Sequence, residues 1–358
     1  MPSLRIGAST IGPDRPCFVI AEAGVNHDGC VDQALALVDV AAFAGADAVK
    51  FQTFQADRLV TRDARKAAYQ AERTGADETQ ADMLRRLELS ADAHYRIAAR
   101  CEEQEITFLS TPFDEESCDF LCALGLPALK LPSGEITNLA FLAHCARTGR
   151  PLILSTGMAT LDDVATAVAI IRGAGDPPLA LLHCVSDYPA DPADANLRAM
   201  ATLAERFQVP IGWSDHTPGT AVSVAAVALG AAIVEKHITL DATLPGPDHA
   251  ASLEPNELNA LVRGIRMAES ALGSGLKVPA ASEAECAQAA RRSLVAARDL
   301  PAGHCLDSAD LVARRPGTGI SPARLEDVIG HVLVAPIKRD TPLDWDHVPA
   351  ARGEVLRR

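Results

Sequence analysis

Two lysines and a group of hydroxyl side chains stand at the ends of hydrophobic runs in this sequence. The lysines are Lys50, in AVKFQT, and Lys130, in ALKLPS, and the hydroxyl residues of the neighbouring runs are Thr111, Ser133, Ser155 and Ser214. Ammonium groups supply positive charge and each hydroxyl can donate to one oxygen, so the set can bind a phosphate or a carboxylate. One lysine alone would more simply reach solvent, but two lysines with several hydroxyls favour an anion site.

Two histidines, His216 and His237, close the last two hydrophobic runs. The carboxylates that could accompany them are Glu22, Asp215, Glu235 and Asp248. Imidazole with carboxylate and water suits an octahedral Mn²⁺, Co²⁺ or Mg²⁺ ion, which can polarise a carbonyl group. A single histidine is more often a hydrogen-bonded structural residue. Two histidines at the ends of adjacent strands favour a metal site.

The elements that must position these residues are eight hydrophobic runs of strand length, which alternate with helical patterns. The runs cover 18–24, 48–53, 106–111, 128–133, 152–156, 179–184, 210–216 and 232–239. The helical patterns cover 32–44, 115–124, 138–147, 161–173, 196–207, 220–229 and 255–272. This alternation predicts an α/β fold, the (β/α)8 TIM barrel, in which the C-terminal ends of all strands meet at one mouth.

The connection between the second and third runs is too long for a simple crossover. Residues 56–89 are polar, charged and partly helical, and only 90–104, which begins at Ser90, has the pattern of an outer helix. Long loops at a barrel mouth are usually lids or substrate-binding loops. We therefore predict that 56–89 covers part of the site.

The pattern changes after Gly273. A linker of small and polar residues follows, and from Arg291 onward short apolar runs are broken by Pro and Gly turns, which is typical of a small β domain. The predicted organisation is a catalytic barrel over 1–275, a linker over 276–290 and a small, mostly β domain over 291–352.

Composition and charge exclude several classes of protein. The net charge of −14 argues against a nucleic-acid partner, but it permits an anionic substrate where lysines cluster. The sequence has neither a membrane-spanning run nor the zones of a signal peptide, so we expect no membrane association and a cytoplasmic location. Nine cysteines without a C-x-x-C pair indicate neither a disulfide framework nor a thiolate zinc site. No glycine motif for a nucleoside triphosphate or a dinucleotide is present.

Several strings of the sequence together resemble one family over nearly the whole chain. The strings IAEAGVNHDG, AVKFQTF, LKLPSGEITN, LLHCVSDYP, IGWSDHTPG and GPDHAASLEP resemble the sialic acid (nonulosonic acid) synthase family. RRSLVAARDLPAGHCL and RRPGTGIS resemble its C-terminal antifreeze-like (SAF) domain. The resemblance implies condensation of phosphoenolpyruvate with an open-chain N-acylated hexosamine and water, giving a nine-carbon 2-keto sugar acid and phosphate.

The resemblance also implies roles for particular residues. His216 and His237 would bind the divalent metal, for which we expect Mn²⁺, with Mg²⁺ or Co²⁺ as alternatives. The catalytic residues would be Glu22, Asp248, Lys50 and Lys130, with Glu22 the best candidate for the base that activates water; the residue types do not decide which of the two carboxylates has which role. The other substrate contacts would be Gln52, Thr111, Ser133, Glu135, Ser155, Ser186, Tyr188 and Ser214.

One further residue is expected from a second subunit. Arg315, in the RRPG turn, would correspond to the arginine that the C-terminal domain of the family inserts into the site of a neighbour to bind the N-acyl group. The resemblance therefore implies a domain-exchanged homodimer.

The choice of sugar and one alternative function stay open. The aldose would be N-acetylmannosamine or 2,4-diacetamido-2,4,6-trideoxymannose, and the product N-acetylneuraminate or N,N'-diacetyllegionaminate. KFQT at 50–53 and Ser186 look closer to the legionaminate type, and residues 69–78 and those near Arg291 are expected to decide. The alternative is a divergent metal-dependent barrel aldolase or a sugar-acid binding protein. A Schiff-base aldolase needs a desolvated lysine with a depressed pKa, whereas hydroxyls accompany both lysines here.

Overall fold

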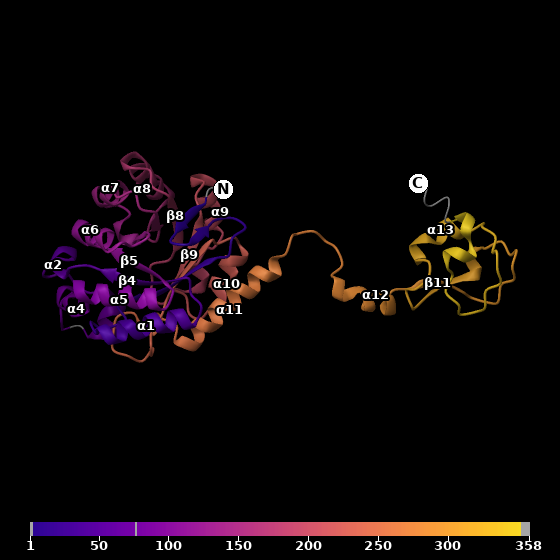
Figure 1. Ribbon diagram of the computed structural model, residues 1–358, viewed down its shortest axis with the longest axis horizontal. Coiled ribbons are helices and arrows are strands. Elements are labelled where there is room, and N and C mark those ends of the chain that lie inside the picture. Colours follow the sequence, from indigo (N-terminus) through magenta and orange to yellow (C-terminus); the bar gives the residue numbers. More distant parts are fainter. Residues whose placement is uncertain (1–2, 76, 352–358) are drawn as a thin grey trace. The chain divides into compact units, whose positions relative to one another are not determined.

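The computed structural model describes residues 3–75 and 77–351, which belong to two compact units, Met1–Gly273 and Ser274–Arg358 (Figure 1). The first unit ends two residues before the predicted end of the barrel at 275. The predicted first residue of the barrel, Met1, and the predicted last residue of the small domain, Arg352, lie outside the described residues.

An eight-stranded parallel sheet forms the centre of the first unit. Its strands are β3 (Phe18–Gly24), β4 (Ala48–Thr53), β5 (Thr107–Pro112), β6 (Leu129–Leu131), β7 (Leu152–Ser155), β8 (Leu179–Cys184), β9 (Ile211–Asp215) and β10 (Ile233–His237). The hydrogen-bonded order is β5-β4-β3-β10-β9-β8-β7-β6, and the two end strands, β5 and β6, lie next to each other. The predicted barrel is confirmed, with every strand within two residues of its predicted bounds.

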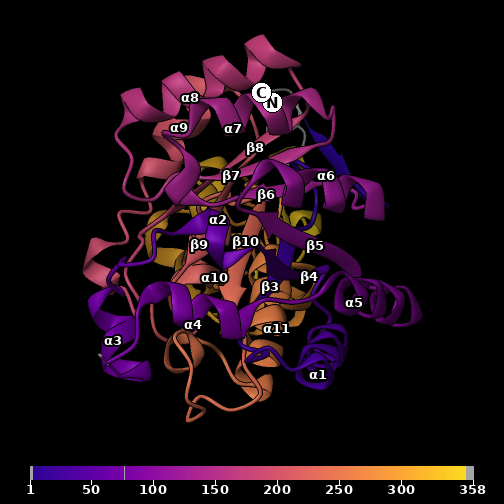
Figure 2. The same ribbon diagram turned by 90° about the vertical axis from the view of Figure 1, so that its left-hand side faces the viewer.

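Eight helices surround these strands as the outer layer (Figure 2). They begin and end within three residues of the predicted bounds and are α1 (Val31–Phe43), α5 (Ala91–Glu103), α6 (Glu115–Leu124), α7 (Leu139–Arg147), α8 (Leu161–Ala174), α9 (Ala199–Phe207), α10 (Ala221–Ala228) and α11 (Pro255–Leu272). Side-chain caps define several starts, because Ser90 accepts from the amide of Ala93, and Thr160 accepts from that of Asp163. Between the helices and the strands lies the main hydrophobic core, which includes the fully buried Trp213.

Alternation along the strands separates the barrel interior into an apolar layer and a polar layer. Ile20 on β3 and Ile233 on β10 belong to a buried cluster inside the barrel. Two residues further along the same strands stand Glu22 and Glu235, which face the same side because side chains repeat every second residue. The polar layer therefore lies toward the C-terminal ends of the strands.

A hairpin that the sequence analysis did not predict closes the opposite end of the barrel. Its strands, β1 (Leu4–Ile6) and β2 (Ser9–Ile11), pair antiparallel. Leu4, Ile6 and Ile11 are buried in the same cluster as Ile20. The hairpin thus excludes water from beneath the apolar layer.

The long connection between β4 and α5 contains three short helices, α2 (Ala56–Leu59), α3 (Ala68–Thr74) and α4 (Gln80–Leu87). Met83, Leu84 and Leu87 of α4 pack against Val25 and Phe54 in a separate apolar cluster. This packing fixes the segment over the barrel, as the predicted role of a substrate-binding loop requires.

The second unit has its own hydrophobic core, which includes Leu294, Leu300 and Leu343. Its two-stranded antiparallel sheet consists of β11 (Ser293–Ala296) and β12 (Leu311–Arg314), and a short helix, α13, spans Leu325–Val328. Helix α12 (Ala284–Ala290) occupies the second half of the segment predicted as a linker. In the described part of the chain no helix combines the length and hydropathy that crossing a membrane requires.

Candidate active site

A cavity of about 440 Å³ opens at the C-terminal ends of the strands. Every strand of the barrel, or the residues directly after it, contributes to its wall. The residues predicted from the sequence that line it are Glu22, Lys50, Gln52, Thr111, Lys130, Ser133, Ser155, Ser186, Tyr188, Ser214, His216 and His237. The barrel thus brings together side chains that are far apart in the sequence.

The first lysine of the cavity, Lys50, is held between two neighbouring strands. Its ammonium nitrogen lies 2.5 Å from Oε2 of Glu22 and donates to the hydroxyl of Thr111 at 2.9 Å. Both charged side chains are buried. Burial raises the pKa of Glu22 to about 7, although Lys50 acts in the opposite direction. Glu22 can therefore exchange a proton near neutral pH.

The second lysine, Lys130, donates to the hydroxyl of Ser155 at 2.7 Å. Glu235, which the sequence analysis named only as a possible companion of the histidines, connects the two lysines. Its oxygens lie 3.5 Å from the nitrogen of Lys130 and 4.0 Å from that of Lys50, and Ser214 donates to it at 3.0 Å. Burial alone would raise the pKa of Glu235, but the two ammonium groups outweigh burial and hold the pKa at about 2. Glu235 stays ionised and offsets part of their charge.

The two histidines lie side by side, with ring centroids 5.6 Å apart. The Nδ1 atom of His216 is 2.6 Å from the carbonyl oxygen of Val185 and donates to it, which leaves the Nε2 lone pair free. Among the described residues, Nδ1 of His237 is buried without a hydrogen-bond partner. Burial lowers the pKa of both histidines, so both rings are neutral, as metal ligation requires.

An aromatic stack extends from the histidines to the loop above them. The ring of Tyr188 lies 4.1 Å from that of His216, and the ring of Tyr69 in α3 stacks on Tyr188 at 5.1 Å. Burial, followed by the charge of Asp248, raises the pKa of both tyrosines. Asp248 is itself buried, and burial raises its pKa to about 6. Flat rings therefore line this end of the cavity, and the charge of one buried carboxyl group outside the lining acts on both tyrosines.

Comparison with known proteins identifies the family. The NeuB family profile matches residues 37–277, and the SAF domain profile matches residues 291–349. The chain belongs to the NeuB family. The sialic acid synthase resemblance seen in the sequence is thereby confirmed, together with its SAF domain.

Two relatives of this NeuB-family chain are named as N,N'-diacetyllegionaminic acid synthases. The protein from Legionella pneumophila is 47% identical, over 96% of this chain and 98% of its own length. The protein from Campylobacter jejuni is 45% identical, over 90% of this chain and 97% of its own length. A solved structure of the sialic acid synthetase from Leptospira borgpetersenii, in complex with citrate, is 38% identical with a TM-score of 0.70, and the match covers 79% of this chain and 94% of that one.

Three of the predicted site residues do not line the cavity of the NeuB-family barrel. Asp248 lies near Tyr69 and Tyr188, on whose pKa values its charge acts. Glu135, in the 3-10 turn Ser133–Glu135, accepts from the side chain of Asn138 at 2.7 Å. Arg315 belongs to the second unit, where its Nε donates to the carbonyl of Ala290 at 2.9 Å. Its role in a neighbour's site stays a prediction.

The carboxylate next to the first histidine faces away from the cavity. Asp215 pairs with Lys236 at 3.1 Å and accepts from Thr217 and Ser223. Adjacent strand residues point to opposite faces, so Asp215 and Lys236 face the helices while Ser214 and Glu235 face the mouth. Of the carboxylates named beside the histidines, Asp215 therefore has a structural role.

Gly157 packs closely against residues of the cavity, and the sequence analysis did not name it. Its amide donates to the hydroxyl of Ser133 at 2.9 Å. A Cβ at this position would lie 2.2 Å from Oγ of Ser186, 2.8 Å from Sγ of Cys184 and 2.9 Å from Oγ of Ser133. The sequence does contain a signal for this position, because in the string STGMA the glycine directly follows a predicted strand. A glycine at such a place often marks a close approach of the backbone to other groups.

Proposed function

We propose that this NeuB-family protein is a phosphoenolpyruvate-dependent nonulosonic acid synthase. It joins phosphoenolpyruvate to open-chain 2,4-diacetamido-2,4,6-trideoxymannose, with water, and releases N,N'-diacetyllegionaminate and phosphate. The names of the relatives at 47% and 45% identity support this choice of sugar. N-acetylmannosamine, which would give N-acetylneuraminate, is the competing substrate.

The observation that carries the proposal is the presence of two buried lysines in one cavity. Lys50 and Lys130 share the carboxylate of Glu235, which stays ionised, whereas Glu22, with a pKa of about 7, is only partly ionised at neutral pH. Phosphoenolpyruvate carries a carboxylate and a phosphate, which together can complete the neutralisation of both ammonium groups. The hydroxyls of Thr111, Ser155 and Ser133 and the side chain of Gln52 would bind the remaining oxygens.

The histidines fit a divalent cation. Both rings are neutral, and the hydrogen bond of His216 to a backbone carbonyl fixes the tautomer that leaves Nε2 available. Synthases of this family are generally metal-dependent. We assign His216 and His237 as the ligands and Mn²⁺ as the expected ion; when bound, it would polarise the aldehyde oxygen of the sugar.

The carboxyl groups of the chain perform the proton transfers. In the condensation, C3 of the enol phosphate bonds to the aldehyde carbon, water adds at C2, and the C2–O bond to phosphate breaks. Glu22, with a pKa of about 7, is the base that accepts a proton from this water. Asp248, beside Tyr69 and Tyr188, holds the sugar or transfers the proton of its oxygen.

A second copy of the chain completes the proposed site. Arg315 is exposed at the turn after β12 of the SAF unit, and we assign it to bind the N-acyl group of the sugar in the site of the partner subunit. The assembly that follows is a domain-exchanged homodimer.

The assay that tests this function measures phosphate release and product mass. The protein is incubated with phosphoenolpyruvate, Mn²⁺ and each aldose in turn. We expect phosphate release to require the aldose and the specificity constant to be higher for the diacetamido sugar. A higher constant for N-acetylmannosamine would assign the enzyme to neuraminate synthesis, and no phosphate release with either aldose would refute the synthase function.

A further inference from the structure

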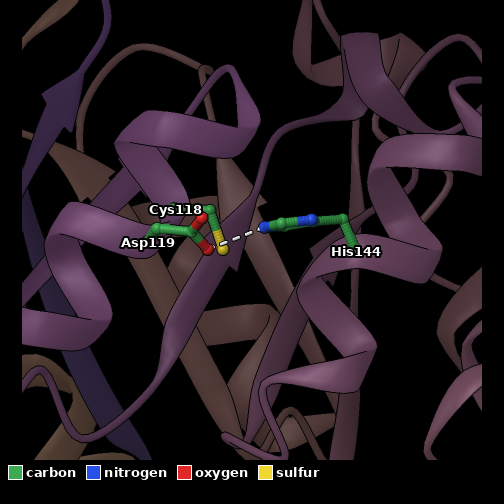
Figure 3. Close-up of side chains that lie close together, drawn as sticks. All are labelled: Cys118, Asp119 and His144. Atoms are coloured by element: carbon green, nitrogen blue, oxygen red, sulfur yellow. Dashed lines mark hydrogen bonds and ion pairs between the residues drawn. The ribbon is translucent and has the colours of Figure 1, made fainter.

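A second group of metal-ligating side chains lies on the outer helices of the barrel, away from the cavity. Cys118 and Asp119 stand on α6 and His144 stands on α7, and the three side chains point toward one another (Figure 3). One ligand atom from each of them lies within 4.8 Å of the other two. None of the three residues lines the cavity described above.

The surroundings of the cluster contain two more sulfur atoms. The thiols of Cys122, one turn further along α6, and of Cys145 on α7 both lie near the sulfur of Cys118. Nε2 of His144 and Oδ1 of Asp119 lie 2.7 Å apart. Cys118 is fully buried, whereas the Asp119 side chain is 65% exposed, so the cluster extends from the core to the surface.

We propose that Cys118, Asp119 and His144 bind a Zn²⁺-type divalent cation. Thiolate, imidazole and carboxylate are the usual zinc ligands, at about 2.0–2.3 Å from the ion, and a tetrahedron with such bonds places its ligand atoms roughly 3.6 Å apart. The three ligand atoms already lie within 4.8 Å of one another, so small side-chain movements assemble the site. Water takes the fourth position.

Charge and proton balance favour such an ion. The thiolate of Cys118 and the carboxylate of Asp119 together neutralise two positive charges. Binding releases the thiol proton of Cys118 to solvent and moves the proton of His144 to Nδ1, so the affinity increases with pH. The cysteine spacing in the sequence did not indicate this site, because its ligands come from two helices and include only one of the cysteines as a direct ligand.

The location suggests what the ion does. Helix α6 follows β5, and helix α7 follows β6. Strands β5 and β6 lie next to each other but are not hydrogen-bonded neighbours in the described sheet. Thr111 at the end of β5 and Lys130 on β6 stand on the two sides of this seam. A cation bound to both helices would therefore hold the barrel closed where the strand pairing does not.

The test uses the full-length chain carrying His216→Ala and His237→Ala, which removes the proposed catalytic ligands. The reduced, metal-free protein is titrated with Co²⁺, because a thiolate ligand gives a sulfur-to-cobalt charge-transfer absorption in the near ultraviolet that histidine and carboxylate ligands do not give. We expect one equivalent of Co²⁺ with this absorption, displaced by Zn²⁺, and a rise in Tm when Zn²⁺ is present.

The variants separate a built site from general thiol binding. Cys118→Ser should abolish the charge-transfer absorption, and His144→Ala, at a half-buried position that should not disturb folding, should weaken Zn²⁺ binding by about tenfold or more. Cys305→Ser removes an exposed cysteine of the second unit and serves as the matched control. Absence of the absorption in the parent chain, or full retention of it and of Zn²⁺ affinity in His144→Ala, would overturn the proposal. Circular dichroism checks that each variant is folded.

Discussion

The carboxylate of Glu22 lies 2.5 Å from the ammonium group of Lys50, with both side chains buried at the end of neighbouring strands. Such a contact would ordinarily hold the pKa of a carboxyl group low. Here burial, together with the charge of Glu235, outweighs the lysine and the pKa rises to about 7. The same buried cluster thus contains one carboxylate that stays ionised and one carboxyl group that titrates near neutral pH.

This titration predicts the pH dependence of the reaction. As a base, Glu22 acts only when it is deprotonated, so kcat/KM should fall as the pH decreases below about 7. Glu22→Gln should lower kcat roughly 10²–10⁴-fold and remove this acidic limb. Stopped or continuous phosphate assays over a range of pH measure both effects. An unchanged limb in Glu22→Gln would assign the proton transfer to another group.

The carboxylate between the two lysines predicts a stability effect. Glu235→Gln leaves the buried ammonium group of Lys130 without its carboxylate partner at 3.5 Å, while Lys50 keeps Glu22, and removing one member of a buried ion pair costs about 3–5 kcal/mol. Urea unfolding should therefore show a lower free energy of unfolding for this variant. Phosphate, as a replacement anion, should stabilise the variant more than the unchanged protein, and equal stabilisation of the two would contradict the assignment.

The histidine pair predicts loss of metal-dependent turnover. His216→Ala and His237→Ala should each abolish turnover in the presence of Mn²⁺, since one imidazole provides too few protein ligands. Electron paramagnetic resonance of free Mn²⁺ measures binding independently of activity. A variant that retains full activity would show that its histidine is not a ligand.

The close contacts of Gly157 predict a geometric effect. Gly157→Ala would place a methyl group 2.2 Å from Oγ of Ser186 and must displace Ser186, Ser133 or the loop. A displacement of about 1 Å in an active site can lower the rate roughly 10²-fold, and we expect a loss of this order in kcat/KM. Gly134→Ala is the matched control, because Gly134 also lines the cavity but a Cβ there meets no atom within 4 Å. Similar losses in the two variants would refute the steric explanation.

The domain-exchanged dimer predicts complementation between two inactive chains. Lys130→Ala removes a barrel residue and Arg315→Ala removes the proposed contribution to the partner's site. Neither variant alone should turn over the aldose at low concentration, because Arg315→Ala raises the KM for the sugar. After mixing and subunit exchange, one intact site forms per mixed dimer and activity should appear. Activity that never exceeds the sum of the two parents would exclude the exchanged site.

Much of the barrel could be predicted because its signals are local. Hydrophobic runs of strand length, alternating with helical patterns, gave all eight strands of the sheet, and each strand end was rich in polar residues. The β1–β2 hairpin was not predicted, because strands of three residues give too short a pattern to recognise. Within a strand, the two-residue period also determines that Glu235 and His237 share a face, while Lys236 points away.

The sequence by itself determined which side chains reach the mouth of the barrel: Lys50, Lys130, His216 and His237 follow from strand position and alternation. The tertiary structure alone decided their partners. Glu235 lies between two lysines of other strands, and Tyr69 reaches Tyr188 from a loop helix. The alternation of side chains along a strand specifies which face of the sheet each residue occupies, but not its distance from side chains on other strands of the closed barrel. Those distances depend on the register of all the strands and on the packing of the loop above them, and they also determine which carboxyl group keeps its charge.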